Sequence, residues 1–409
     1  MAGQGRGGSR RRRRAVALGA AALVLASGCA APAQPDTTRQ DIQTVLDRRA
    51  AAVVGRDESA YLAAVDPRAG SERATEQREF RNLAEVPLGS WDYRVKSVRR
   101  TGTLATAEID LRYRIKGYDR APAVSARTLE LRADGGRWYI AADRPGKGAG
   151  RLLWQQGKVT AVAGARSLVL GVGQRAALLR EVAAVEDRAV PAVDSAWQEK
   201  WAGRVVVLMP SSLEAMASLL GAPAASYRGI AAVTTGEAGG SDSAPADRVI
   251  VNPQAYAILG AFGQRVVATH ETTHVATRQH TTAATPLWLS EGFADWVAYR
   301  GSGRTAPQAA PELQSAVRGG SLPATLPSDG DFGFGGDADR LARAYEGGWL
   351  ACKLIAEKWG EAKLTAFYRA VGAHKTRDGA EEKAMNDVLG TTPEDFAARW
   401  REYLRDQLG

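Results

Sequence analysis

The first part of the chain changes from helical to extended spacing of its apolar positions. Residues 37–54 place apolar side chains three and four positions apart, which predicts an amphipathic helix, and a second short helix is expected over residues 58–65. Four segments then place an apolar side chain at every second position, as half-buried strands do. These predicted strands lie around residues 91–95, 109–115, 129–131 and 138–140. Helices followed by one-sided strands favour an α+β domain over residues 37–145.

The order of these elements resembles the nuclear transport factor 2-like fold, in which a curved antiparallel sheet wraps around helices. The resemblance implies an accessory domain that could host a pocket. Residues 37–145 contain no histidine, and no pairing of histidine with a carboxylate is therefore available there. We expect a structural or substrate-presenting role for this domain rather than catalysis.

Beyond a glycine-rich linker at residues 146–150, apolar runs and helical periodicities alternate over residues 155–405. The predicted elements are a hairpin at 158–171, a helix at 176–197 that Pro191 should kink or break, buried strands at 205–209 and 248–252, and helices at 213–220, 262–277, 341–358, 362–371 and 393–404. A further helix opens at Pro286, and the Gly-, Pro- and Ala-rich segment 301–336 predicts a mobile loop. The whole chain is therefore expected to be α+β, with a helical C-terminal lobe.

Composition and charge narrow the class of protein. The 409 residues suggest two or three domains, and 45% apolar with 24% charged residues is typical of globular chains. The formal net charge is +9, but six arginines lie within the first 28 residues, which contain no acidic residue. The remaining chain carries a net charge of only +3. This near balance argues against nucleic acid as a partner.

The N-terminus has the pattern of an export signal. A basic run precedes an apolar stretch of 13 residues, 15–27, which is too short to span a bilayer, so residues 1–28 are predicted to be a signal peptide. The small residues before Cys29 resemble the bacterial lipobox, although Leu25 stands one position further back than usual. The resemblance implies a lipid on Cys29, a tether over residues 29–36, and a lipoprotein on the extracytoplasmic face of the cell membrane. Simple cleavage with release is the alternative, and the arginine run also allows the twin-arginine export route.

The chain contains two cysteines. If Cys29 carries a lipid, Cys352 has no partner for an intramolecular disulfide bond. Cys352 lies within an apolar helical pattern, which predicts a buried and unreactive thiol. Stability must then come from the apolar core, with or without a bound metal ion.

The most informative motif is the segment HETTH. Two of the four histidines of the chain, His270 and His274, stand four positions apart in it, which on a helix places both imidazoles on one face. Such a pair can bind one zinc ion, with Glu271 beside it as general base. Glu291, 17 positions after His274, offers a third ligand. With four histidines in 409 residues, chance seldom produces this spacing.

Three protein ligands leave a fourth position open for water, as a catalytic rather than a structural zinc site requires. A fourth ligand would close the site. His280 is the nearby residue that could supply one, but it follows a predicted break in the helix and lies outside the face formed by His270 and His274. We therefore do not expect His280 to bind the metal.

HETTH followed by WLSEGFA resembles the gluzincin zinc metallopeptidases, and among them the bacterial peptidase MA-like group, over residues 155–405. By position, the resemblance implies that His270, His274 and Glu291 bind zinc and that Glu271 is the general base and acid. In thermolysin-like gluzincins an aspartate at the position of Asp295 accepts a proton from a ligand histidine, which orients that ligand. The alternative for Asp295 is an ordinary surface residue.

The resemblance also implies a second group that stabilises the developing oxyanion. Tyr345 resembles the tyrosine found on a later helix of the MA-like group, and His374 is the second choice. The alternative for Tyr345 is a core aromatic residue on a helix.

The expected substrate is a peptide or protein. Gluzincin aminopeptidases carry a G-x-M-E-N strand that recognises a free N-terminus, whereas the segment at residues 248–252 here reads RVIVN. A strand above the zinc could instead pair with an extended peptide, which favours an endopeptidase. Two alternatives stay open: a catalytically inactive zinc-binding scaffold or sensor, and a hydrolase acting on a non-peptide substrate. Glu271 argues against the scaffold, because zinc binding alone does not need it.

Overall fold

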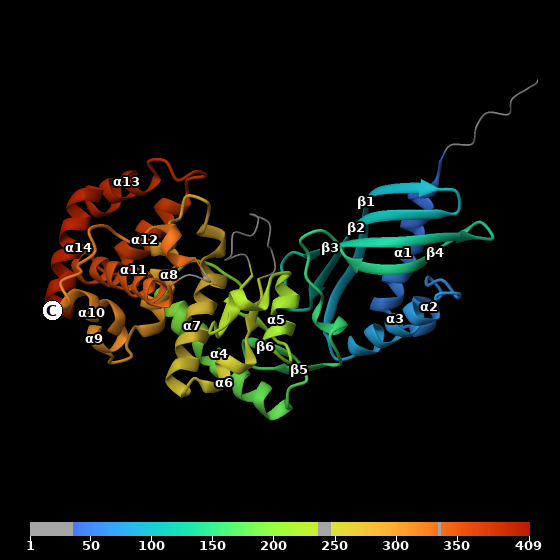
Figure 1. Ribbon diagram of the computed structural model, residues 1–409, viewed down its shortest axis with the longest axis horizontal. Helices are drawn as coiled ribbons and strands as arrows, with labels where there is room; N and C mark the ends of the chain where they lie inside the picture. Colours follow the sequence, from blue (N-terminus) through green and yellow to red (C-terminus); the bar gives the residue numbers. More distant parts are fainter. Residues whose placement is uncertain (1–35, 236–246, 334–336) are drawn as a thin grey trace, which may run out of the picture. The chain divides into compact units, whose positions relative to one another are not determined.

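The computed structural model describes residues 36–235, 247–333 and 337–409 (Figure 1). The predicted signal peptide, Cys29 and nearly all of the tether lie outside the described residues. Residues Thr38–Gly409 form one compact unit, so the boundary between the two predicted domains stays a prediction. Within the described ranges, no helix has both the length and the apolarity needed to span a bilayer.

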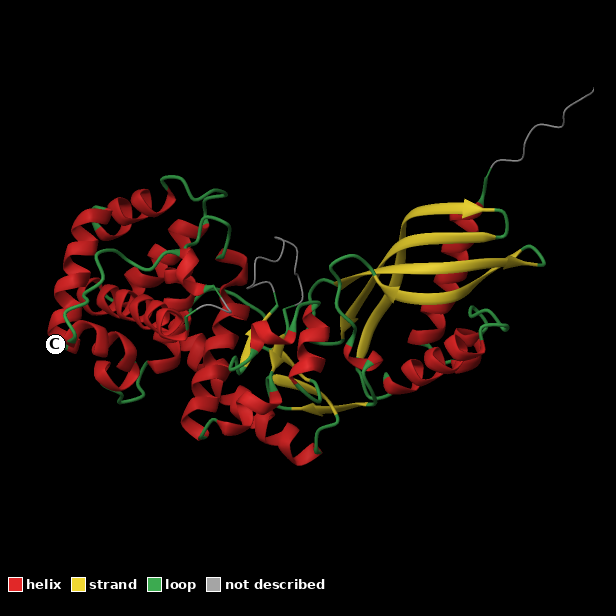
Figure 2. Ribbon diagram, in the orientation of Figure 1, coloured by secondary structure: helices red, strands yellow, loops and turns green. Residues whose placement is uncertain are grey.

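The N-terminal part pairs three helices with a four-stranded antiparallel meander in the order β1-β2-β3-β4 (Figure 2). Its elements are α1 (Thr38–Val54), α2 (Glu58–Leu62), α3 (Gly70–Asn82), β1 (Leu88–Thr101), β2 (Leu104–Ile115), β3 (Ala123–Asp134) and β4 (Arg137–Pro145). Alternate residues of β2 are buried, and α1 packs on β1 through the fully buried Ile42 and Leu46. The sequence pattern did not predict α3, because Phe80 is its one buried apolar residue.

A second, five-stranded sheet has the order β5-β6-β7-β9-β8 and mixes parallel with antiparallel pairs. Its strands are β5 (Val159–Ala163), β6 (Ser167–Val172), β7 (Val205–Met209), β8 (Ala232–Thr234) and β9 (Val249–Val251). β9 lies between β7 and β8, so the expectation that residues 248–252 pair with a peptide is wrong. Among the described strands, β8 is the outer one on that side. The antiparallel sheet, the mixed sheet and the helices make this an α+β protein, as predicted.

Helix α4 (Ala176–Ala196) follows β6 and packs against it. All six residues of β6 are buried because both faces of this sheet are covered: Val169 faces a core shared with Leu179 and Val182 of α4, whereas Leu168 faces the opposite core. α4 continues through Pro191, so the alternative of a break there is wrong. Pro191 lies on the exposed side of the helix.

The rest of the chain is mostly helical. It contains η1 (Leu153–Gln155), α5 (Leu213–Leu220), η2 (Ala224–Tyr227), α6 (Pro253–Ile258), α7 (Ala261–Thr277), η3 (Arg278–His280), α8 (Leu287–Tyr299), α9 (Ala306–Ala309), α10 (Pro311–Arg318), η4 (Asp329–Phe332), α11 (Ala338–Trp359), α12 (Glu361–Gly372), α13 (Ala380–Ala384), η5 (Met385–Leu389) and α14 (Pro393–Leu408). The predicted loop at 301–336 therefore holds two helices. The carboxylate of Glu346 accepts hydrogen bonds from the backbone N–H groups of Glu312 and Leu313 at the start of α10.

Helices α8 and α11 cross at a contact between two glycines. A Cβ atom on Gly292 of α8 would lie 2.2 Å from the carbonyl oxygen of Gly348 on α11, so this distance is possible only without a side chain. The buried thiol of Cys352 lies one helical turn further along α11, 3.9 Å from the carbonyl oxygen of Leu289. The crossing brings α11 close to the helix that carries Glu291.

Candidate metal centre

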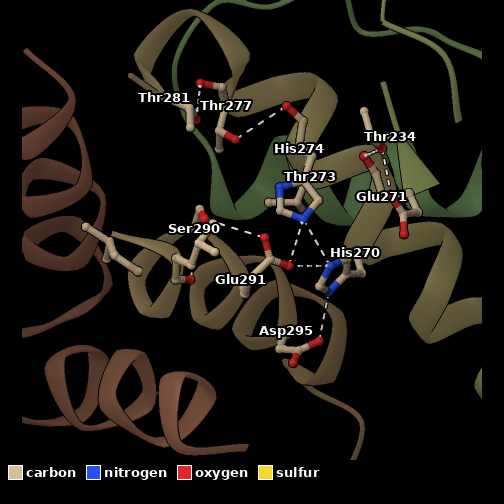
Figure 3. Close-up of polar contacts among 12 residues, drawn as sticks. Thr234, His270, Glu271, Thr273, His274, Thr277, Thr281, Ser290, Glu291 and Asp295 are labelled. Atoms are coloured by element: carbon tan, nitrogen blue, oxygen red, sulfur yellow. Dashed lines mark hydrogen bonds and ion pairs between the residues drawn. The ribbon is translucent and has the colours of Figure 1, made fainter. Parts of the chain in front are cut away.

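Helix α7 presents His270 and His274 one turn apart, with their Nε2 atoms 3.0 Å from each other (Figure 3). α7 packs against α4 and α8, and its buried face includes Thr269, Thr272 and Thr273. Because the helix is held on two sides, both imidazoles have a defined direction. The side chain of His274 is 5% exposed and that of His270 is 12% exposed, so the pair lies in a site largely shielded from solvent.

Helix α8 adds a carboxylate to this pair. α8 begins after Pro286, and Glu291 lies on its buried face. The Oε2 atom of Glu291 is 3.3 Å from Nε2 of His270 and 3.4 Å from Nε2 of His274. One ligand atom from each of the three residues lies within 4.8 Å of the others.

Asp295, one turn after Glu291, contacts the other nitrogen of His270. Its Oδ1 atom lies 2.8 Å from Nδ1 of His270. A proton on Nδ1 is then shared with the carboxylate, and Nε2 of His270 turns a lone pair toward His274 and Glu291. The structure thus places Asp295 beside His270, one of the three candidate ligands, and not in an isolated position on the surface.

These contacts fit a divalent cation at the centre of the three residues. The Oε2 atom of Glu291 is buried and accepts no hydrogen bond, which is costly for a carboxylate oxygen in the interior. The Nε2 atoms of the two imidazoles, 3.0 Å apart, face the same centre. Two histidines, one carboxylate and one open position are the donor set of catalytic zinc sites. His270, His274 and Glu291 could therefore hold zinc.

The charges around the site favour an ionised carboxylate. Burial disfavours a charge on Glu291, but the neighbouring His274 and His270 outweigh it and lower the pKa of Glu291 below its ordinary value. Burial likewise opposes a charge on His270, whereas Asp295 and Glu291 raise the pKa of His270 overall. Glu291 is thus kept as an anion, the form that could bind a metal cation.

The side chain of Glu271 lines the same pocket as His270 and contacts Thr234 of β8 (Figure 3). The hydroxyl of Thr234 donates a hydrogen bond of 2.7 Å to Oε2 of Glu271 and lies 3.1 Å from its backbone oxygen. Both residues are buried, at 1% and 5% exposure. Thr234 could not be predicted from the sequence, because the three-residue strand β8 gives no periodic signal and Thr234 is 37 positions from Glu271.

Tyr345 of α11 lies next to His270, and the centroids of the two rings are 6.2 Å apart. Phe332 packs edge-on against Tyr345, with the ring centroids 5.2 Å apart. His280 instead packs against Trp197 and is not part of the three-residue group. His374, whose backbone oxygen accepts a hydrogen bond from Thr282, is not among the described residues around the adjacent pocket, whereas Tyr345 is.

A pocket of about 370 Å³ opens beside the three converging atoms. His270, Glu271, Asp295 and Tyr345 line it, together with apolar residues of β8 and α11 and of the segment before β8. This volume lies within the range of about 300–1,000 Å³ that is usual for small-molecule sites. The pocket is thus large enough for a substrate group next to the candidate metal centre.

Comparisons with known proteins identify no family: no protein-family model and no curated protein matches this sequence. Among solved structures, yeast LTA4 hydrolase is 14% identical, with 68% of this chain aligned to 43% of that chain at a TM-score of 0.37. A point variant of Rv3472, a function unknown protein from Mycobacterium tuberculosis, is 14% identical over 26% of this chain and 69% of its own, with a TM-score of 0.22. RPA3114, a SEC-C motif containing protein from Rhodopseudomonas palustris, is 19% identical over 24% of this chain and 72% of its own, with a TM-score of 0.19. At these TM-scores no functional argument rests on the likenesses.

Proposed function

We propose that this chain is a zinc-dependent metallopeptidase of the gluzincin type that hydrolyses peptide bonds. The observation that carries the proposal is the convergence of three lone-pair atoms, from His270, His274 and Glu291, on one point in a shielded site. Glu271 stands next to this point and lines the pocket beside it. The donor set and the adjacent carboxylate are those of metal-assisted hydrolysis.

A zinc ion, when bound, polarises a carbonyl group and lowers the pKa of water at the site. Glu271 takes a proton from the attacking water as the water oxygen bonds to the peptide carbonyl carbon. Glu271 then delivers this proton to the amine nitrogen as the C–N bond breaks. Thr234 fixes the direction of the Glu271 carboxylate during both transfers. Tyr345, which lines the same pocket, donates a hydrogen bond to the negative oxygen that develops on the substrate.

The proposal places this activity outside the cytoplasm. It rests on the N-terminal sequence: the basic run, the apolar stretch and the small residues before Cys29. In this view the mature protein begins at Cys29 and is held at the membrane by a lipid. Cells that produce the Cys29→Ser variant should release the protein from the membrane fraction and incorporate no labelled fatty acid into it. Equal membrane retention of the variant and the wild type would rule out the lipid anchor.

The test of the catalytic proposal is metal analysis combined with cleavage profiling. The wild type should contain one zinc per chain and cleave members of a broad peptide library. Glu271→Gln should keep the zinc and lose cleavage, whereas the exposed Glu382→Gln should behave as the wild type. Cleavage by Glu271→Gln would contradict the mechanism. A zinc-loaded wild type that cleaves no peptide would favour the scaffold or sensor alternative.

A further inference from the structure

The pocket beside the candidate metal centre is unusual in its charge. Three carboxylate residues line it, Glu271, Asp295 and Glu346, and none of its described lining residues is lysine or arginine. A bound divalent cation would carry two positive charges, whereas the carboxylates around it would carry three negative charges. These carboxylates belong to Glu271, Glu291 and Asp295. An acidic group that entered this pocket would find no cationic partner and would lie close to other carboxylates.

The remaining wall of the pocket is largely apolar. Ile230 and Val233 line one side, and one face of α11 lines the other with Leu341 and Trp349, which are eight positions apart and therefore point in similar directions. Two small residues on the same face, Ala338 and Ala342, leave the space that the pocket occupies. Burial of an apolar group against such a wall is favourable at about 25 cal/mol per Å².

We propose that this pocket receives an uncharged apolar side chain of the substrate, from one of the residues flanking the scissile bond, and excludes acidic side chains there. The inference rests on the proposed function and specifies its substrate class. Ala338 and Ala342 set the depth of the pocket, because larger residues at either position fill it. The carboxylate of Glu346 is held at the pocket wall because it accepts hydrogen bonds from the backbone N–H groups at the start of α10.

The test measures binding and does not depend on hydrolysis. Three peptidyl hydroxamates that differ in one side chain, isobutyl, methyl or carboxymethyl, are titrated calorimetrically into the full-length zinc-loaded protein. The hydroxamate group binds zinc in each, so the side chain accounts for the differences. The isobutyl compound should bind at least about tenfold more tightly than the carboxymethyl compound, since pocket contacts of this size discriminate by about 10–200-fold.

Ala342→Phe should lower the affinity for the isobutyl compound at least about tenfold, because the new ring occupies its space, and should reduce the preference over the methyl compound. Ala338→Phe, on the exposed first turn of α11, is a second variant with the same expected direction. Ala362→Phe, on the exposed start of α12, is the control and should leave all three affinities unchanged. Circular dichroism and zinc content verify that each variant is folded and loaded.

Tighter binding of the carboxymethyl compound would overturn the inference. An unchanged isobutyl-to-methyl ratio in folded Ala342→Phe and Ala338→Phe would overturn it too. If the isobutyl preference holds and Ala342→Phe removes it, but the wild type cleaves no peptide, the proposed peptidase function fails while the pocket assignment stands. The two hypotheses are thus tested separately.

Discussion

Thr234 contributes to the candidate site through a single hydroxyl. It donates a 2.7 Å hydrogen bond to the Glu271 carboxylate, from the outer strand of the mixed sheet. A hydrogen bond to a charged group contributes about 1.5–3 kcal/mol, so its loss should matter where the direction of that carboxylate decides the rate.

Replacement of Thr234 by valine should therefore lower kcat for peptide cleavage roughly tenfold to a hundredfold, with KM little changed. Valine keeps the shape of threonine and removes the hydroxyl. Thr234→Ser should restore most of the rate, which a purely structural role of the methyl group would not explain. Steady-state kinetics on one cleavable peptide decides the matter, and a wild-type kcat for Thr234→Val would refute the positioning role.

In the proposed zinc site Asp295 would act on the metal through His270, and its effect should appear in zinc affinity. Asp295→Asn keeps the size of the side chain and removes the charge that faces Nδ1 of His270. Loss of such a partner typically weakens metal binding by about 10–100-fold. Competition with a chromophoric chelator measures this, and equal affinities of the variant and the wild type would return Asp295 to an ordinary surface role.

Much of the candidate site could be predicted from residue spacing, and the rest could not. Histidines four positions apart share a helix face wherever the helix lies, so His270 and His274 could be paired from the sequence. Thr234 could not, because its contact with Glu271 depends on where a three-residue strand enters the sheet. Phe332 was missed for the same reason: its contact with Tyr345 joins a short η4 turn to α11.

The α8–α11 crossing shows how an element-level contact positions side chains. Gly292→Ala would place a methyl group 2.2 Å from the Gly348 oxygen, and a backbone atom cannot move aside without shifting its helix. We expect a loss of about 1–3 kcal/mol in the free energy of unfolding, together with reduced cleavage because Tyr345 moves relative to His270. Urea unfolding followed by circular dichroism measures the loss.

Gly70→Ala is the matched control, since a Cβ atom at the start of α3 has no neighbour within 4 Å. It should leave stability unchanged or raise it slightly. A Gly292→Ala variant as stable as the Gly70→Ala variant would show that the crossing tolerates a side chain.

Helices α4 and α7 meet at a buried acid. Glu186 accepts a hydrogen bond from Thr272, and burial, together with the negative charge of Glu271, raises the pKa of Glu186 to about 8. In the unfolded chain the pKa is about 4.3, so the unfolded state loses this proton first as pH rises. The contribution of Glu186 to stability is complete below about pH 4 and is lost as pH rises through about 8.

The melting temperature of the wild type should therefore fall more between pH 5 and pH 8 than that of Glu186→Gln, which cannot ionise and can still accept the Thr272 hydrogen bond. A difference of a few degrees is expected, at about 2–4 °C per kcal/mol for a chain of 150–250 residues. Glu181→Gln, on the exposed side of α4, should follow the wild type. Parallel pH profiles for Glu186→Gln and the wild type would contradict the expectation.

At the element scale, strong periodicity predicted most helices and strands, and weak periodicity hid the others. α3 is polar, with one buried apolar residue, and its ends carry no distinctive capping pattern. α10 lies in a Gly-, Pro- and Ala-rich segment, yet it forms because Glu346 binds its first N–H groups and Leu313 is fully buried. Both contacts come from distant residues, which no local pattern contains. The placement of β9 inside the sheet has the same origin.

For the whole molecule, the metal should contribute to the free energy of unfolding. His270 and His274 on α7 and Glu291 on α8 would be joined by one ion, so that the two helices separate only when it leaves. Removal of zinc by a chelator should lower the melting temperature, because a ligand at 100 times its Kd stabilises by about 2.7 kcal/mol. Added zinc, but not added magnesium, should restore the melting temperature of the chelator-treated protein. A melting curve insensitive to chelator would show that the site holds no stabilising metal.

The thiol of Cys352 can be used to detect local opening of the structure around α11. In a Cys29→Ser protein it is the single thiol, and it is fully buried on α11, where burial raises its pKa well above the usual value. A thiol reagent can therefore reach it only when the packing around α11 opens locally. The rate of labelling in native buffer would time that opening directly, and the same measurement with and without zinc would show whether the ion restrains the helices that surround it.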